Sequence, residues 1–418
     1  MRLDLRELRV LLSRKQIIRW IIMMQIFVIG SVLVLIPVFA MFLMLIINLL
    51  TFPKLRLPSK SEGSIATTSS MVSILVPARN EAHCIEACVR SLVAQTYKRL
   101  EVLVLDDSSS DETGAIVQRI LNELLPEQTG RLRLLHGQPL PEGWIGKTFA
   151  CYQLAQQAQG DYLLFTDADT VHAPETVEAV LACMHCFNVK LLTAQPEFEL
   201  GSPGERLIEP LFQNFILMLL LPTALAWLRP EPSLATGNGQ LLCFHRSAYE
   251  ATGGHTAVKG QVLEDVQLGH AVKAAGYRMV FVDALEFVHS RMYRSFAEIW
   301  AGLSKNIFAF YNYSLPFALV ALLLILILFI APAPLAFTAI ILHLPLNVLL
   351  FGVGVYSLEV LMYILLTLRF TRRKRGLMLL LCFLLPLSVV LYCLILLNSV
   401  RWYYRKTGVE WKGRHYKL

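Results

Sequence analysis

The sequence predicts an α/β domain with a mostly parallel sheet between two membrane-associated ends. Composition is the first reason, because 55% of the 418 residues are hydrophobic and 17% are charged, against about a quarter charged in soluble domains. The second is that short apolar runs alternate with helical patterns between residues 71 and 169. The third is the distribution of charge. Residues 1–60 and 315–418 together hold 20 basic and 4 acidic groups, whereas residues 61–314 hold 18 basic and 27 acidic groups. Basic, apolar ends around an acidic centre indicate a membrane protein with one water-soluble domain.

The N-terminal segment, residues 1–50, is predicted to anchor the chain. Trp20 to Leu50 is a 31-residue run with few polar residues, and one tilted helix needs roughly 20 apolar residues. A single crossing would put the basic residues before the run on the face opposite the central domain. One alternative is therefore an interfacial amphipathic helix over residues 1–15, followed by a hairpin around Pro37.

The C-terminal region, residues 315–398, offers three more candidate spans, at 315–342, 344–368 and 377–397. The loop 369–376 contains five basic residues and is typical of a cytoplasmic loop by the positive-inside rule. Three spans would put the basic tail, residues 399–418, on the side away from the central domain, so the sequence leaves the topology open.

The central domain, residues 71–314, follows a polar linker at 51–70 and begins with four strands and three helices in alternation. The predicted strands are 71–78, 100–107, the run RLRLLHG and 160–169, and the predicted helices are NEAHCIEACVRSLVAQ, 111–125 and WIGKTFACYQLAQQA. Ligands of such sheets bind at the carboxyl ends of the strands. Three of these ends are polar, at Pro77–Glu81, Asp106–Asp107 and Asp167–Asp169, and we expect them to converge on one crevice.

Motifs that are absent narrow the enzyme class. The sequence has no G-x-G-x-x-G and no G-x-x-x-x-G-K-[ST], which argues against dinucleotide-binding dehydrogenases and P-loop enzymes. Asp167 and Asp169, two carboxylates at i and i+2, suit Mg²⁺ bound to a diphosphate, although an acidic turn is the simpler alternative. Asp106 or Asp107 is placed to bind a nucleoside, whereas Asp111 is expected to cap the next helix.

Glu264 and Asp265 open a helical pattern in LEDVQLGHAVKAAGYRM. Two acids at a helix start are favourable for the helix dipole alone. A positioned carboxylate can also take a proton from an acceptor hydroxyl during transfer. This segment by itself leaves a general base and a helix cap equally open.

Taken together, five motifs resemble the GT-A-type family-two glycosyltransferases in order and spacing. They are SILVPARNE, VLDDSSSDET, LLFTDAD, TGNGQLLCFHR and LEDVQLG, and the resemblance covers roughly residues 70–310. The W-x-G-K element at Trp144–Lys147, the apolar segment after residue 204 and the C-terminal spans are similar to the membrane-bound, lipid-modifying branch. That branch includes the bacterial carotenoid and hopene-associated glycosyltransferases and, more remotely, ceramide glucosyltransferase.

The resemblance implies a GT-A, Rossmann-like domain, a nucleotide-diphospho-sugar donor and a role for each matching residue. It implies that donor binding involves Pro77, Arg79, Glu81, Asp106, Asp107, Lys147 and Asp167, and that metal binding involves Asp167 and Asp169. It implies Asp265 as the catalytic base with Glu264 beside it, and Gly239 and Gln240 on the acceptor side, where we also place Trp300. A solvated helix lysine is nearly as good an explanation of Lys147.

The processive members of this family carry Q-x-x-R-W after the base, whereas RMYRSFAEIWAGLSKN (291–306) lacks that motif. One sugar per acceptor is therefore favoured over a polymer. Arg291 or Arg294 could stabilise the leaving diphosphate, and interfacial arginines near lipid headgroups are the alternative.

Two apolar segments lie inside the catalytic region itself, near 205–228 and 295–310. A single crossing at 205–228 would separate Asp169 from Asp265 by the membrane, so we expect an interfacial or re-entrant helix there. The apolar face of 296–307 either lies in the same interface or packs against the sheet.

The sequence thus predicts an inverting glycosyltransferase that uses Mg²⁺ or Mn²⁺ and moves one sugar from a nucleotide sugar, with a UDP-sugar favoured, to a membrane-lipid hydroxyl. We expect a multi-pass protein of the bacterial cell membrane with its catalytic domain in the cytoplasm and no nucleic-acid partner. The alternatives are a polyprenyl-phosphate or polysaccharide glycosyltransferase, and an inactive membrane scaffold.

Overall fold

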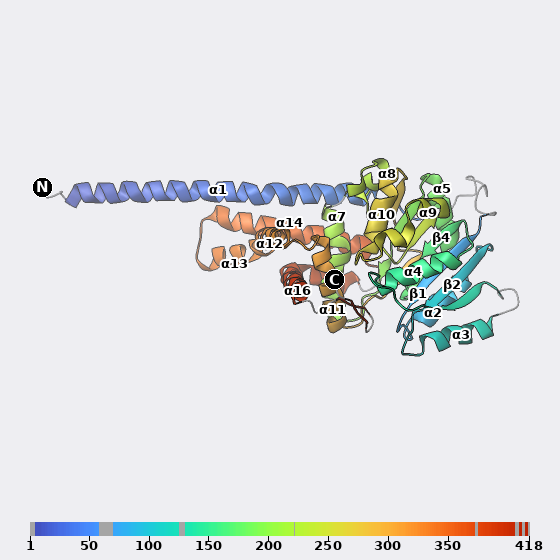
Figure 1. The fold of residues 1–418 in the computed structure, drawn as a ribbon. Helices are drawn as coiled ribbons and strands as arrows, with labels where there is room; N and C mark the ends of the chain where they lie inside the picture. The colour runs from blue at the N-terminus through green and yellow to red at the C-terminus, as the bar shows by residue number, and fades with distance from the viewer. Residues whose placement is uncertain are drawn as a thin grey trace.

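The protein consists of an α/β domain at one end and a group of apolar helices at the other (Figure 1). In this computed structural model the described residues are 5–57, 70–124, 130–220, 222–372, 375–405, 409–411 and 414–416. Most of the predicted linker, at 58–69, lies outside them, and so do Arg373, Lys374 and part of the basic tail.

Seven strands form the main sheet, in the order β3-β2-β1-β4-β8-β6-β9. Only β8 runs antiparallel to its neighbours β4 and β6, so the predicted α/β class with a mostly parallel sheet is confirmed. The strands are β1 Val72–Ala78, β2 Leu100–Asp106, β3 Leu132–His136, β4 Tyr162–Phe165, β6 Leu191–Gln195, β8 Leu242–His245 and β9 Met279–Asp283.

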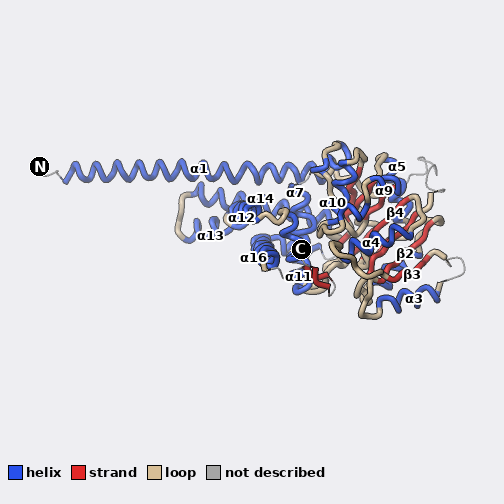
Figure 2. Tube along the Cα trace, viewed as in Figure 1, coloured by secondary structure: helices blue, strands red, loops and turns tan. Residues whose placement is uncertain are grey.

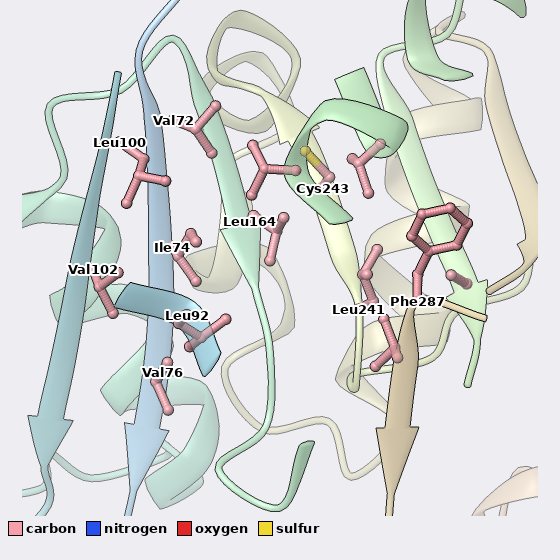
Figure 3. Packing of buried hydrophobic residues seen from close by; sticks show 14 of the residues in the cluster. Val72, Ile74, Val76, Leu92, Leu100, Val102, Leu164, Leu241, Cys243 and Phe287 are labelled. Carbon is pink, nitrogen blue, oxygen red and sulfur yellow. The ribbon is translucent and has the colours of Figure 1, made fainter. Parts of the chain in front are cut away.

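Side chains alternate between the two faces of this sheet, as expected for strands that are buried on both sides. Val72, Ile74 and Val76 of β1 pack with Leu92 on one face (Figure 3), and Leu75 belongs to a separate cluster on the other. The first face is covered by α2 Ile85–Val93, α3 Thr113–Glu123 and α5 Thr176–Cys186, and the second by α4 Gly146–Gln157, α9 Arg246–Ala251 and α10 Glu264–Ala274.

A small second sheet has the order β5-β10-β7, with bounds Thr170–His172, Val288–Ser290 and Glu197–Phe198. Ser290 lies opposite Thr170 in the antiparallel pair. The residue before Thr170 is Asp169 and the residue after Ser290 is Arg291. This sheet therefore brings the end of the D-x-D motif beside the chain that leads toward the apolar helices.

The N-terminal run is one continuous helix, α1 Leu5–Thr51, with Pro37 inside it. The alternatives of a hairpin around Pro37 and of a separate interfacial helix over residues 1–15 are therefore wrong for the described residues. A proline removes one backbone hydrogen bond, but the helix continues because apolar side chains such as Val38 and Leu45 are buried against the other helices.

The C-terminal region contains α12 Leu315–Ile325, α13 Pro332–Ile341, α14 Leu346–Phe370, α15 Arg375–Leu381 and α16 Leu385–Tyr404 (Figure 2). A π-helical turn, η5 Leu326–Ile330, follows α12, so the run 315–342 is not one straight helix. Among the described residues, three helical segments are long and apolar enough to cross a membrane: Ile21–Thr51, Leu346–Phe370 and Arg375–Tyr404.

The segment between the two acidic motifs is broken rather than a single helix. It comprises α6 Pro203–Pro210, a π-helical turn η2 Leu211–Phe215, α7 Ile216–Leu220 and α8 Leu225–Leu228. Farther along, α11 Phe296–Phe310 packs against α16. Buried residues of α1, α6, η2, α7, α11, α12, η5, α14 and α16 form one cluster, called here the bundle core, whose members include Val38, Ile208, Leu211, Phe215, Leu303, Tyr363 and Leu396.

Polar contacts fix the α/β domain to the bundle core. The Asn48 side chain, at the end of α1, donates to the Met218 carbonyl at 2.8 Å and accepts from the Thr223 amide at 3.0 Å. At the end of α14, Arg369 forms an ion pair with Asp283 of β9. Residues 369–372, the described beginning of the basic loop, thus lie against the α/β domain.

Candidate active site

The loops that follow β1 and β2 are locked together. Asn80 and Ser108 both have positive φ, at 52° and 55°, a conformation that is uncommon outside glycine. The Asn80 amide donates to Ser109 Oγ at 3.0 Å, and Arg79 donates to the Asp107 and Ser108 carbonyls. Arg79, predicted to bind the donor, therefore braces this loop with one guanidinium nitrogen, while Pro77 lies inside β1.

The two acids at the end of β2, Asp106 and Asp107, lie close to other segments of the same chain. Asp107 is 1% exposed, and a Cβ on Gly137 would lie 2.9 Å from its Oδ1. Asp106 Oδ1 accepts from the Ser109 amide at 3.0 Å. Asp111 accepts from the Thr113 amide at 3.0 Å, but the N-cap of α3 is Glu112, so the prediction that Asp111 caps this helix is wrong.

Hydrogen bonds that the sequence did not reveal hold the D-x-D turn in place. Thr170 Oγ1 donates to the Asp167 carbonyl at 2.7 Å and lies 3.1 Å from His172 Nε2. Thr166 Oγ1 lies 2.9 Å from the same nitrogen. Burial lowers the pKa of His172 to about 3, so this imidazole is neutral near pH 7 and orients the turn without adding charge.

Lys147 joins the acids of two motifs that are distant in the sequence. Its Nζ lies 2.7 Å from Asp167 Oδ1 and 3.2 Å from Glu264 Oε1. Burial acts to lower the pKa of this ammonium, but the charges of Asp167 and Glu264 outweigh it and raise the pKa. In this structure Lys147 is therefore an ion-paired group and not a solvated helix lysine.

Asp265 begins α10 beside this ion pair. Its Oδ2 accepts from the Gly239 amide at 2.9 Å, and its Oδ1 accepts from the Val266 amide at 2.8 Å. Burial, followed by the charge of Glu264, raises the pKa of Asp265 to about 7, and Lys147 opposes that shift. Lys147, Asp167, Glu264 and Asp265 are called the Lys147 cluster below.

The glycines of TGNGQ let the Lys147 cluster form. A Cβ on Gly237 would lie 2.3 Å from the backbone of Asp265, and a Cβ on Gly239 would lie 2.9 Å from Lys147 Nζ. Close approach of two chain segments is a common reason for glycine at such a position. The motif is thus explained by packing against the start of α10.

The partly buried thiol of Cys84 interacts with Glu81 and with Asp169 of the D-x-D turn. Burial raises the pKa of the Cys84 thiol, and the charges of Glu81 and Asp169 raise it further. Ligand atoms of Glu81, His83 and Cys84 lie within 4.8 Å of one another. A protonated thiol is a poor metal ligand, so Asp167 and Asp169 remain the better candidates for a hard cation.

Other predicted residues lie elsewhere. Gln240 is 1% exposed and donates to Ser290 Oγ at 2.7 Å. Arg291 pairs with buried Glu205 at 3.2 Å, and the Arg294 amide donates to Glu298 at 2.9 Å. Trp300 packs beside Phe296 at the edge of the bundle core. Their roles in diphosphate or acceptor binding stay predictions.

Residues 73–201 match the sequence model of the family Glycosyl transferase family 2. This chain is a glycosyltransferase with a family-2 domain. The matched residues contain the main-sheet strands β1, β2, β3, β4 and β6, the D-x-D turn and Lys147. Three predicted motifs, SILVPARNE, VLDDSSSDET and LLFTDAD, lie within these residues, so the resemblance to family-two glycosyltransferases is confirmed there. TGNGQLLCFHR and LEDVQLG lie beyond the matched residues, and their roles stay predictions.

The relatives of this glycosyltransferase include carotenoid enzymes. It is 27% identical to the 4,4'-diaponeurosporenoate glycosyltransferase of Staphylococcus haemolyticus (strain JCSC1435) over 62% of this chain and 64% of that protein, just under two thirds of its length. It is 25% identical to the protein of the same name from Staphylococcus aureus (strain MRSA252) over 83% of this chain and 88% of that one.

Two solved structures share parts of the arrangement. A mannosyltransferase from Pyrobaculum calidifontis, in complex with GDP-Man and Mn²⁺, aligns with a TM-score of 0.48 and 19% identity over 80% of this chain and 86% of that one. S. aureus TarS 1–349 in complex with UDP-GlcNAc aligns with a TM-score of 0.40 and 15% identity over 81% and 93%.

Proposed function

We propose that this glycosyltransferase moves a single sugar from a nucleotide-diphospho-sugar, with a UDP-sugar favoured, to a lipid acceptor, with inversion at the anomeric carbon. The Lys147 cluster carries this proposal, because Lys147 lies 2.7 Å from the D-x-D acid Asp167 and 3.2 Å from Glu264. Asp265, the residue after Glu264, accepts from the Gly239 amide beside them. A donor-binding acid and a candidate base therefore act on one site.

Asp265 is proposed as the general base. A pKa of about 7 allows a substantial fraction of the carboxylate at neutral pH while keeping it basic enough to take a proton from a hydroxyl. The amides of Gly239 and Val266 orient both carboxylate oxygens. Glu264 beside it keeps Lys147 in place.

A divalent cation, Mg²⁺ or Mn²⁺, fits the donor set. The Lys147 cluster holds three carboxyl groups and one ammonium, and Asp169 follows Asp167 by two residues, so the region is acidic and would repel a diphosphate without a counter-ion. Carboxylate oxygens are also the ligands that these hard cations prefer. Asp167 and Asp169 would hold the cation, which would supply positive charge to the leaving diphosphate.

The acceptor proposed is a carotenoid-related or other terpenoid lipid of the membrane. Two relatives act, by their names, on 4,4'-diaponeurosporenoate, and the bundle core offers an apolar route beside the site. That name denotes a carboxylate, which is ionised already and needs no base. A carboxylate acceptor is therefore the second candidate, and the raised pKa of Asp265 favours the hydroxyl.

We further propose a multi-pass protein of the bacterial cell membrane with the catalytic domain on the cytoplasmic side. The three apolar segments support the membrane placement. The ion pairs Arg369–Asp283 and Arg372–Glu286 place the basic loop against the domain, and such loops are enriched on the cytoplasmic side.

The experiment supplies labelled UDP-, GDP- and dTDP-sugars to membranes that contain the protein, with membranes of the empty host as the control. We expect one donor class to label a lipid that carries one sugar, with the anomeric configuration opposite to that of the donor. EDTA should stop the labelling, and Mg²⁺ or Mn²⁺ should restore it. A ladder of products would refute the transfer of a single sugar, and retained configuration would refute inversion. Full activity in EDTA would refute the need for a divalent cation.

A further inference from the structure

A buried carboxyl lies between the D-x-D turn and the bundle core. Glu209, in the last turn of α6, is 2% exposed, and its Oε1 has no hydrogen-bond partner among the described residues. Burying a polar group without a partner costs free energy, and buried polar groups in proteins are nearly always hydrogen-bonded. A missing partner at such a position therefore points to a ligand.

The position of Glu209 is set by the start of its helix. Ser202 and Glu205 form a capping box, with Pro203 at the first turn. Glu205, one turn before Glu209, pairs with Arg291, which follows β10. Since β10 lies beside β5, which follows Asp169 directly, the carboxyl of Glu209 is held toward the D-x-D turn.

Electrostatic shifts agree with this placement. Burial raises the pKa of Glu209 well above its usual value, and the charges of Glu205 and Asp169 raise it further, against Arg291. Burial and then the charges of Glu209 and Asp169 raise the pKa of Tyr293. Glu209, Asp169 and Tyr293 therefore interact in one poorly solvated region.

The adjacent residues of the same segment face the apolar side. Ile208 and Leu211 are buried in the bundle core, and Phe215 packs edge-on against Tyr363 of α14 at 5.4 Å. The chain between them is the π-helical turn η2, and such turns are frequent at functional sites. Glu209 is therefore the acidic side chain in a segment whose neighbouring residues Ile208 and Leu211 belong to the bundle core.

A cavity lies near the start of α6, and Glu209 is not among the residues that line it. A cavity of about 200 Å³ is lined from the domain by Glu199, Gly201, Arg206 and Arg291, and from the helical side by Thr371 and Met378. Arg291 also pairs with Glu205, so the cavity adjoins the start of α6. Its walls come from both parts of the protein.

We propose that Glu209 positions the lipid acceptor by hydrogen-bonding its reacting polar group as that group reaches the D-x-D turn. This inference rests on the proposed transfer to a lipid. Glu209 is a positioning residue, distinct from Asp265, because it acts on the acceptor and leaves the donor and the proton transfer to the Lys147 cluster.

The test compares Glu209→Ala and Glu209→Gln with the wild-type protein in lipid vesicles that contain 4,4'-diaponeurosporenoate or a total lipid extract. Glu209→Ala should raise the acceptor KM by about 10- to 100-fold, the range that follows from losing one hydrogen bond to a buried group. Donor KM and slow hydrolysis of the donor by water should change less than about twofold. Glu209→Gln keeps a hydrogen-bonding group and should restore most of the acceptor affinity.

Glu101→Gln is the matched control, because Glu101 of β2 is also buried, at 4% exposure, but its carboxylate accepts a hydrogen bond from Ser73 of β1. It should leave the acceptor KM unchanged even if it lowers thermal stability. An unchanged acceptor KM in Glu209→Ala, or an equal rise in donor KM, would overturn the role of Glu209 alone. Absence of any labelled lipid with the wild-type protein would overturn the proposed function together with this inference.

Discussion

At the scale of single residues, the site depends on how two carboxylates differ. Asp167 contacts the ammonium of Lys147 directly, whereas Asp265 is held by backbone amides and lies next to Glu264. A carboxylate beside a cation is kept ionised, and a buried one beside another acid is pushed toward protonation. The two acids are therefore suited to charge binding and to proton transfer, respectively.

Replacing Asp265 by Asn tests the base. The amide cannot accept the proton, so kcat for a hydroxyl acceptor should fall by about 10²- to 10⁴-fold, while the Kd of the donor stays close to that of the wild-type protein. Single-turnover transfer and donor binding by calorimetry measure the two quantities. Normal turnover would refute the base, and normal turnover on a carboxylate acceptor alone would select that acceptor class.

The raised pKa of Asp265 predicts a pH dependence. The base acts as the carboxylate, so kcat/KM should fall as the pH drops through about 7, approaching a tenfold loss for each further pH unit. The acidic limb should be absent from the residual activity of Asp265→Asn. A profile that stays flat from pH 8 to pH 5.5 would contradict the assignment.

The two glycines of TGNGQ should respond differently to alanine. At Gly239 the new Cβ meets the flexible end of Lys147, so we expect the lysine to move and transfer to fall by more than about tenfold, with little loss of stability. At Gly237 it meets the backbone of Asp265, so thermal stability should fall as well. Gly376→Ala, with open space around the Cβ, is the control. Equal melting temperatures for both site variants would show that the backbone contact is not restrictive.

At the scale of elements, the end of α1 joins the broken helix that follows the D-x-D motif. Asn48 is fully buried and holds the segment from Met218 to Thr223 through its amide group. This segment continues from α6, which carries Glu209. The N-terminal helix is thus a structural support for the acceptor side of the site as well as a membrane segment.

Asn48→Leu should weaken that junction. The substitution keeps the size of the side chain but leaves the Met218 carbonyl and the Thr223 amide without their partner, at a cost of about 1–3 kcal/mol for each buried group. Thermal unfolding in detergent measures the loss, which Asn48→Gln should not reproduce in full if its longer amide reaches one partner. A stability equal to that of the wild-type protein would mean that water replaces the asparagine.

At the scale of the whole molecule, the long apolar helices extend from one end of the α/β domain. The helix α1 extends away from the α/β domain (Figure 1), and α14 lies beside it, as the Phe27–Phe351 contact at 5.8 Å shows. Both helices end at the domain, since Phe52 contacts Phe281 and Phe370. The start of α1 and the basic loop 369–376 are therefore at opposite ends of these helices.

This arrangement predicts that the N-terminus and the catalytic domain are on opposite faces of the membrane. An epitope tag at the N-terminus should be digested by protease added to intact cells, after permeabilisation of any outer layer, whereas a tag at the exposed residue Glu142 should be protected. Inside-out vesicles should reverse the pattern. Equal protection of both tags would mean that α1 lies along one face instead of crossing.

Many features of the domain followed from local patterns. Short apolar runs located β1, β2, β3 and β4, because strands of a parallel sheet that is covered on both faces are almost continuously apolar. The acids at their ends were recognisable because parallel strands present their carboxyl ends at one edge. Lys147 was ambiguous because its partners, Asp167 and Glu264, are 20 and 117 residues away, and no local pattern records such a contact.

The sequence by itself determined the α/β class, the membrane-like ends and the acids of the site, since these depend on periodicity, composition and short spacing. Tertiary structure decided what long-range packing controls: the continuity of α1 through Pro37, the ion pair of Lys147, the partner of Arg291 and the burial of Glu209. A side chain's charge state and partners depend on the groups that folding brings around it, and those groups come from distant parts of the chain.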